Sequence, residues 1–167
     1  MDITKAYTIG EMLSQTLRAT TFRARRKDSS ETVRLIHLDC KRASASDHER
    51  FHREVDVIKN LDHENIPRLL DVVTESDAVY LVHGDFHGTP LKSVIREQKR
   101  INLPDFLRLA ACMAETLQAV HDGSVTHRNI TSENVLVDDG LERIALVNFG
   151  AAFTLTHEDV DLFTATC

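Results

Sequence analysis

The spacing of apolar residues changes near residue 90 from that of strands to that of helices, and this change limits the possible folds more than any other feature. Before it, four runs rich in apolar and β-branched residues are typical of strands: Tyr7 to Lys27, Glu31 to Asp39, Leu69 to Val73 and Ala78 to Val82. The polar Asp28-Ser29-Ser30 predicts a turn between the first two runs. Ser46 to Asn60 has apolar residues at helical spacing, with Asp47 as its expected N-cap. The first half is therefore expected to be β-rich with one helix.

The second half of the chain has the apolar pattern of helices first and of short strands later. Leu91 to Lys99 and Asp105 to His121 carry apolar stripes at helical spacing. Asn134 to Val137 and Ile144 to Val147 are short apolar runs, separated by a turn at Asp138-Asp139-Gly140. Because no linker or repeat divides the chain, the sequence predicts a single α+β domain.

The composition argues against several classes of protein. With 167 residues, 42% of them hydrophobic, the chain can bury one compact core. A net charge of -6 and the lack of a long Lys/Arg block argue against nucleic acid as a partner. No apolar run approaches the ~20 residues of a membrane span, so we expect a soluble, cytoplasmic protein with no membrane partner. Cys40, Cys112 and Cys167 lie far apart without metal-ligand spacing, which fits a reducing compartment.

Two polar motifs adjoin the short strands: His127-Arg128-Asn129-Ile130-Thr131-Ser132-Glu133-Asn134 and Asn148-Phe149-Gly150. They resemble the His-Arg-Asp-x-x-x-x-Asn and Asp-Phe-Gly motifs of protein kinases, whose aspartates accept the substrate proton and bind Mg²⁺. Asn129 and Asn148 replace both aspartates, and an amide lacks the charge and basicity of a carboxylate. The resemblance therefore implies a kinase frame with degenerate base and metal positions. In that frame Asn134 keeps the chemistry of a metal ligand, and His127 and Arg128 would brace the loop.

The resemblance to a serine/threonine protein-kinase domain covers nearly the whole chain. It implies a two-lobe fold, with the N-lobe at about residues 1–84, the hinge at about 84–90 and an incomplete C-lobe at about 91–167. More narrowly, Leu81 to Gly88 and Asn148 to Ala152 resemble the kinase-like domain that opens bacterial hybrid sensor kinases. The chain ends at Cys167, inside the expected activation segment. The helix from Asp105 to His121 should then expose an apolar face to a protein partner or a missing C-terminal region.

The phosphate-binding loop of the family has no glycine here. Ser14, Thr16 and Ala19 stand where the resemblance places three glycines, so backbone amides should approach phosphates less closely. The simplest interpretation of this segment is a β-hairpin that bears side chains.

The phosphate-binding lysine of the family is also missing. Ile36 stands at its position in the Val-Ala-Ile-Lys pattern, whereas Glu54, the expected partner of that lysine, remains. We expect Glu54 to face solvent. The alternative is a pairing of Glu54 with Arg18, Arg34 or Lys41, and a buried, unpaired carboxylate would have a raised pKa.

Nucleotide binding is separable from these losses, because adenine binding uses an apolar cleft and hinge backbone groups. In the resemblance, His83 has the gatekeeper position and Gly84-Asp85-Phe86 forms the connector, while Val137 and Val147 are available to line the cleft. His83 itself is expected to be a packed or hydrogen-bonded residue at the edge of the core. No cofactor is required for the expected function, and ATP and Mg²⁺ remain open as ligands.

A competing motif is His48-Glu49-Arg50-Phe51-His52, which fits the His-Glu-x-x-His pattern of zinc metalloproteases. The charges of Asp47, Arg50 and Arg53 around it, and the lack of a third ligand at a familiar spacing, argue against a zinc site. The favoured hypothesis is a catalytically impaired pseudokinase that acts as a signalling or scaffolding module. An active but unconventional ATP-dependent serine/threonine kinase is the alternative, and a zinc metalloprotease is a distant third.

Overall fold

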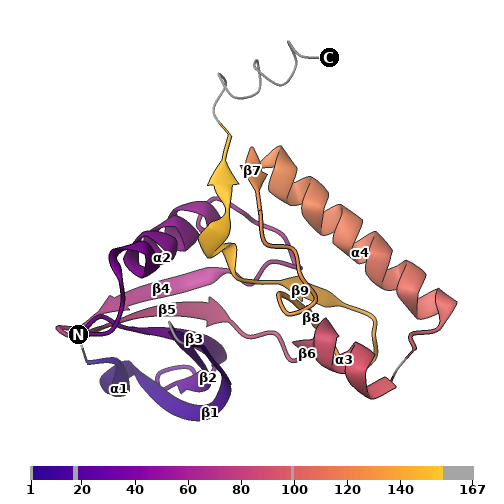
Figure 1. Ribbon diagram of the computed structural model, residues 1–167. Helices are drawn as coiled ribbons and strands as arrows, with labels where there is room; N and C mark the ends of the chain where they lie inside the picture. Colours follow the sequence, from indigo (N-terminus) through magenta and orange to yellow (C-terminus); the bar gives the residue numbers. More distant parts are fainter. Residues whose placement is uncertain (1, 17–18, 99, 156–167) are drawn as a thin grey trace.

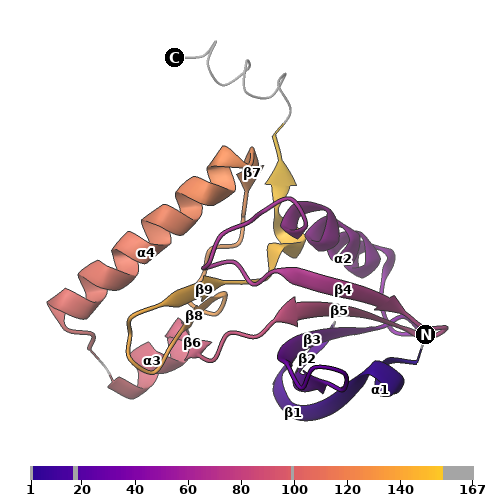
Figure 2. The same cartoon turned by 180° about the vertical axis from the view of Figure 1, so that it is seen from behind.

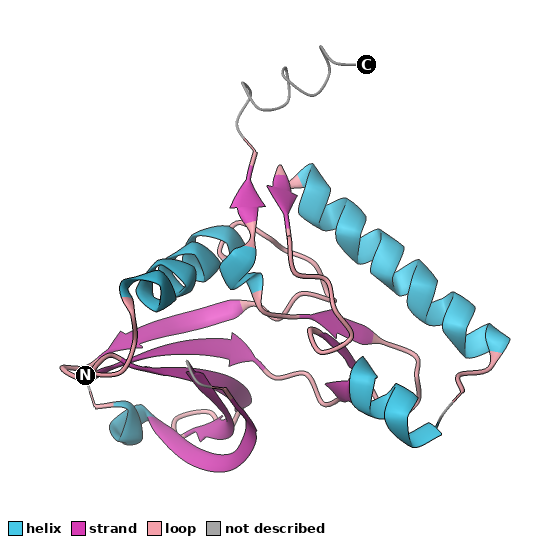
Figure 3. Ribbon diagram, viewed as in Figure 1, coloured by secondary structure: helices cyan, strands magenta, loops and turns pink. Residues whose placement is uncertain are grey.

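The computed structural model describes residues 2–16, 19–98 and 100–155 (Figure 1). The first half of the chain forms a β-rich unit, and the second half, which contains the longest helix, lies beside it in views from opposite sides (Figure 2). The structure is α+β, with a β-rich first half and helices in both halves, so the predicted fold class is confirmed (Figure 3). The predicted boundaries between the two lobes stay a prediction.

The first half of the chain is a five-stranded antiparallel sheet with a helix above it (Figure 1). Its elements are α1 (Ile3–Ala6), β1 (Tyr7–Gln15), β2 (Ala19–Arg26), β3 (Thr32–Asp39), α2 (Ala45–Ile58), β4 (Leu69–Thr74) and β5 (Ala78–Gly84). The strand order is β1-β2-β3-β5-β4. The run predicted from Tyr7 to Lys27 contains two strands, because Gln15 pairs with Thr20 and the chain reverses between them. The hairpin expected in place of the phosphate-binding loop, around Ser14 to Ala19, is therefore present.

Helix α2 begins at Ala45 because Ser44, and not the predicted Asp47, is its N-cap. Ser44 Oγ accepts a hydrogen bond from the backbone N of Asp47 at 3.3 Å, and the backbone N of Ser44 donates to Asp47 Oδ2 at 2.9 Å. This reciprocal pair is a capping box, which satisfies backbone groups that the helix itself leaves unbonded. Both residue types can cap a helix, so the sequence alone did not distinguish them.

The second half combines helices with short strands. Its elements are β6 (Thr89–Pro90), α3 (Leu91–Gln98), α4 (Leu103–Asp122), β7 (Val125–Thr126), β8 (Val135–Val137), β9 (Ile144–Leu146), the 3₁₀ helix η1 (Phe149–Ala151) and β10 (Phe153–Thr154). Strands β6, β8 and β9 form one antiparallel sheet, and β7 pairs with β10. Within the described part of the chain, no helix combines the length and the apolar character that crossing a bilayer requires.

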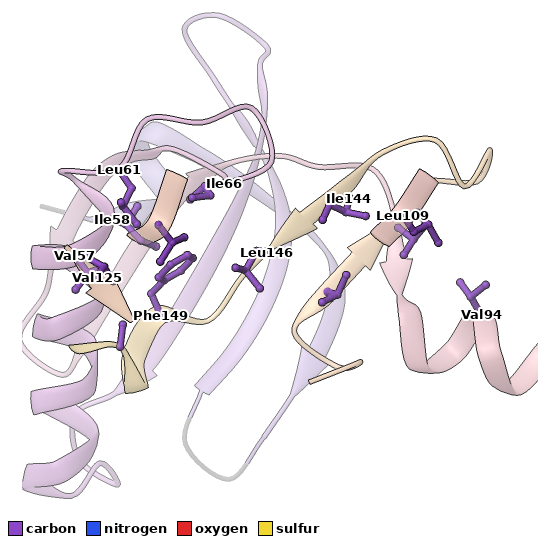
Figure 4. Close-up of a cluster of buried hydrophobic side chains, with 14 of the residues drawn as sticks. Val57, Ile58, Leu61, Ile66, Val94, Leu109, Val125, Ile144, Leu146 and Phe149 are labelled. Atoms are coloured by element: carbon purple, nitrogen blue, oxygen red, sulfur yellow. The ribbon is translucent and has the colours of Figure 1, made fainter. Parts of the chain in front are cut away.

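The main hydrophobic core joins α2 to the strands and turns of the second half (Figure 4). Phe149, which is 0% exposed, lies beside Val57 and Ile58 of α2 in this cluster. Because α2 packs on η1, the core fixes the chain that follows Val147 against the β-rich unit. This packing sets the position of both polar motifs.

Candidate functional site

A cleft of about 1130 Å³ lies between one face of the five-stranded sheet and the polar motifs of the second half. The predicted site residues that line it are Ser14, Thr16, Ala19, Ile36, Glu54, His83, Asn129, Asn134 and Asn148. Val147 also lines the cleft as expected, whereas Val137 is buried in the main core. The fold therefore brings most of the predicted positions together around one cavity, although they come from distant parts of the sequence.

Three asparagines form a hydrogen-bonded series on the floor of the cleft. Asn148 Nδ2 donates to Asn134 Oδ1 at 3.1 Å, and Asn134 Nδ2 donates to the backbone O of Asn129 at 2.8 Å. Asn148 has a left-handed backbone with φ 68°, which asparagine tolerates better than most residues. The Asn134 amide thus bonds the Asn148 side chain and the Asn129 backbone, without any charge. The side chains at positions 129, 134 and 148 supply neither a proton acceptor nor an anionic metal ligand.

His127 holds the backbone on both sides of this series through its two ring nitrogens. Its Nε2 lies 3.1 Å from the backbone O of Val147, and its Nδ1 accepts from the backbone N of Asn129 at 3.2 Å. The ring meets Phe149 edge to face, with centroids 4.5 Å apart. Burial lowers the pKa of His127, and both ring nitrogens bond the backbone, so the ring acts as a structural link. Arg128 is exposed, with its guanidinium 5.8 Å from the centroid of the Phe153 ring.

Glu54 is buried, so the expectation that it faces solvent is wrong. It is 6% exposed, and its Oε1 accepts from the backbone N of Phe149 at 3.4 Å. Packing of α2 on η1 turns the side chain inward. Two of the three alternative partners of Glu54 have other partners: Lys41 pairs with Asp77, and Arg34 donates to Phe86 O. The third, Arg18, lies outside the described residues. Burial raises the pKa of Glu54 to about 7, only partly opposed by the Phe149 N–H.

The hairpin of β1 and β2 brings side chains, and not open backbone, to the cleft. Thr16 Oγ1 accepts a hydrogen bond from the backbone N of Ala19 at 3.0 Å, and the backbone N of Thr16 donates to Ala19 O at 2.9 Å. These bonds use backbone groups that a phosphate-binding loop would offer to a ligand. Leu17, between these residues, lies outside the described part of the chain. The structure of the described residues agrees with a simple hairpin.

The residues after β5 belong to a polar cluster that sequence analysis did not identify. Asp85 Oδ2 lies 3.3 Å from Arg23 Nε, and Arg34 Nη2 donates to the backbone O of Phe86 at 3.4 Å. Neither Asp85 nor Phe86 lines the cleft itself. The available signal was Arg34 at the alanine position of the Val-Ala-Ile-Lys pattern, where a long charged side chain replaces a small apolar one.

His83 is a buried residue at the same end of the cleft, as expected. It is 4% exposed, and its Nδ1 lies 3.4 Å from the backbone O of Pro67. Burial lowers the pKa of His83 to about 4, so the ring is neutral at physiological pH. Its role is therefore packing and hydrogen bonding, without charge.

The zinc-protease motif lies on α2, where His48 is half-buried and Glu49 and His52 are exposed. Across residues 2–16, 19–98 and 100–155, no group of three or more His, Cys, Asp or Glu side chains is arranged to hold a metal ion. The metalloprotease alternative therefore has no support from the structure.

Comparison with known proteins relates this chain to one family. The family model described as protein kinase domain matches residues 7–167. The chain is 29% identical over 127 residues to a probable myosin light chain kinase of Dictyostelium discoideum, covering 74% of this chain and 32% of that protein. It is 29% identical over 114 residues to the probable serine/threonine-protein kinase YbdM of Bacillus subtilis, covering 67% and 43%. It is 28% identical over 156 residues to the serine/threonine-protein kinase PkaB of Streptomyces coelicolor, covering 87% and 36%. The chain spans less than half the length of each relative.

Proposed function

Because the chain belongs to the protein kinase family, we propose that it is a pseudokinase, a kinase-fold module that signals or scaffolds without transferring phosphate. The observation that supports this proposal best is the hydrogen-bonded series from Asn148 through Asn134 to Asn129. Phosphoryl transfer needs a proton acceptor for the substrate hydroxyl and carboxylate ligands for the metal. The side-chain amides at these three positions supply neither.

Protein kinases use ATP and Mg²⁺, and the residues of this cleft fit that pair poorly. Mg²⁺ is usually held by one or two carboxylates, whereas Asn134 Oδ1 is an uncharged acceptor already bonded to Asn148. Ile36 offers no positive charge to the phosphates. In the β1–β2 hairpin, Thr16 Oγ1 already accepts the backbone N–H of Ala19, which is then not free for a phosphate. We therefore assign no catalytic step to a metal-bound nucleotide in this cleft.

An active but unconventional serine/threonine kinase is the second candidate, and one observation favours it. The backbone N of Phe149 contacts Glu54 Oε1, so α2 is docked against the motif that begins at Asn148. Active kinases require this helix and this motif to be in place together. The arrangement supports a preserved frame, and the chemistry of the side chains argues against turnover.

Radiolabelled ATP distinguishes the two candidates. We expect no label on the protein or on a general protein acceptor with Mg²⁺ or Mn²⁺, since loss of a general base alone typically lowers the rate ~10²–10⁴-fold. Arg25→Ala, at an exposed position of β2, is the control variant. Label that appears with the wild type and with Arg25→Ala, but is lost in Asn129→Ala and Asn148→Ala, would establish the active kinase and refute the pseudokinase.

The start of α4 supports a scaffolding role. Leu103, Phe106 and Leu107 are 67%, 56% and 56% exposed, and contiguous apolar surface of this kind usually marks an association site. We propose that a protein partner covers this apolar start of α4. The relatives contain protein beyond the matched region, which is consistent with such a cover. The bacterial hybrid-sensor setting stays a prediction.

The double substitution Phe106→Ser/Leu107→Ser should reduce both dye binding and self-association. We expect the fluorescence of an apolar-surface dye to fall by roughly half, because two of the three exposed large apolar side chains at the start of α4 are removed. Gel filtration of the same samples reports association. Leu70→Ser, at a 41% exposed position on β4, serves as the control and should change neither measurement. A monomeric wild type that binds no dye would contradict the proposed surface.

A further inference from the structure

We propose that Arg34 closes the hinge end of the cleft and excludes adenine, so that this single side chain determines whether the cleft accepts a nucleotide base. The proposal goes beyond the absence of phosphoryl transfer, because a kinase-fold protein without catalytic carboxylates can still bind a nucleotide through its base. It concerns a different part of the cleft from the asparagine series.

The alternation of β3 points Arg34 into the cleft. Val33 and Leu35 are fully buried in the smaller core cluster on the other face of the sheet. Arg34, Ile36 and Leu38 line the cleft, as the two-residue period of a strand requires. Arg34 is only 8% exposed, so its guanidinium lies within the protein and not in solvent.

Strand pairing places Arg34 in a row of polar residues across the sheet. Arg23 of β2 is opposite Arg34, and Arg34 is opposite His83 of β5. Like charges at directly opposite positions repel each other, and Asp85 offsets this repulsion by its contact with Arg23 at 3.3 Å. His83 contributes no third charge because its ring is neutral. All three residues of the row line the cleft.

The guanidinium of Arg34 also takes a backbone acceptor next to the hinge. Its Nη2 donates to the backbone O of Phe86 at 3.4 Å. Adenine sites combine apolar walls with free backbone groups of this connecting segment. Here the alanine expected from the family pattern is replaced by a long cationic side chain, whose guanidinium reaches this segment and bonds Phe86 O.

Two polar atoms of this row are buried and lie where a purine ring would pack. Among the described residues, neither Arg34 Nε nor His83 Nε2 has a hydrogen-bond partner, although both atoms are buried. The hydrogen-bonding atoms of adenine lie on the edge of the ring, so a ring packed face-on against the row would leave these two atoms unpaired, which is unfavourable. Steric exclusion and polarity therefore act in the same direction.

Isothermal titration with adenosine tests the proposal. Adenosine has a base but no phosphate, so its binding is independent of Mg²⁺, of Ile36 and of phosphoryl transfer. We expect no binding to wild type at about 1 mM adenosine, and binding to Arg34→Ala that is at least about tenfold tighter. Arg25→Ala, at the exposed position of β2, is the matched control and should behave as wild type.

Arg34→Val guards against a variant that fails to fold, because valine is well suited to a strand and also lacks the guanidinium. Circular dichroism establishes which variants are folded. The proposal is overturned if wild type binds adenosine as tightly as either folded variant, or if both folded variants fail to bind. Transfer of label from ATP would refute the pseudokinase proposal. It would not decide the role of Arg34, because adenosine carries no phosphate and its binding is measured independently.

Discussion

Replacement of Glu54 by glutamine is expected to stabilise the protein by about 3 kcal/mol at pH 8 and by less than about 1 kcal/mol at pH 5. The buried carboxyl group has a pKa raised from 4.5 to about 7. The folded protein therefore binds this proton more tightly than the unfolded chain does. The contribution of Glu54 to stability is fully present below pH 4.5 and is lost as the pH rises through about 7.

Glutamine keeps the shape of the protonated acid and its carbonyl can still accept from the Phe149 N–H, but it cannot ionise. Denaturant unfolding between pH 5 and pH 8 measures the difference in the free energy of unfolding. Glu49→Gln, at an exposed position on the same helix, is the control and should show no comparable change with pH. Equal stability of wild type and Glu54→Gln at pH 8 would show that the carboxylate is solvated.

Restoring a cation beside Glu54 should remove the decline in stability with rising pH. Ile36→Lys places an ammonium group on the cleft-facing side of β3, and an opposite charge favours the ionised carboxylate. The decline in stability between pH 5 and pH 8 should then disappear, and adding Glu54→Gln to Ile36→Lys should no longer stabilise the protein. An unchanged decline would mean that position 36 does not reach Glu54.

Phe149→Ala is expected to lower the free energy of unfolding by about 4 kcal/mol, the largest loss among the substitutions considered for this chain. The ring is 0% exposed and meets both His127 and the apolar residues of α2. Its removal leaves a cavity where the two halves of the chain join, and a close-packed core collapses only partly around such a cavity. Amide exchange in α2 should therefore increase more than exchange in β2.

Phe153→Ala is the matched control for this substitution, because Phe153 is 42% exposed and lies only four residues further along the chain. We expect it to cost less than about 1 kcal/mol, chiefly through the contact with Arg128. Denaturant unfolding at one pH compares the two variants. Similar losses for both would show that Phe149 does not form the link between the two halves.

Local patterns in the sequence were sufficient for the order and type of most elements. The apolar spacing of Leu91 to Lys99 and of Asp105 to His121 predicted α3 and α4 to within two residues at the ends that the structure describes. Asn129 and Asn134, which the motif singled out, both line the cleft, whereas His127 and Arg128 do not. These features depend on residues close together in the sequence, so they can be read without knowledge of tertiary contacts.

Tertiary packing alone decided the environments of Glu54 and Arg34. Periodicity places a charged residue on a helix or strand but does not say what covers that face. Glu54 is buried because Phe149, 95 residues away, packs against α2. Arg34 is buried because β3 pairs with β5 and the chain after β5 folds back within reach of its guanidinium. Sequence thus determined the elements and the loss of both carboxylates, whereas the docking of distant segments determined which charges are buried.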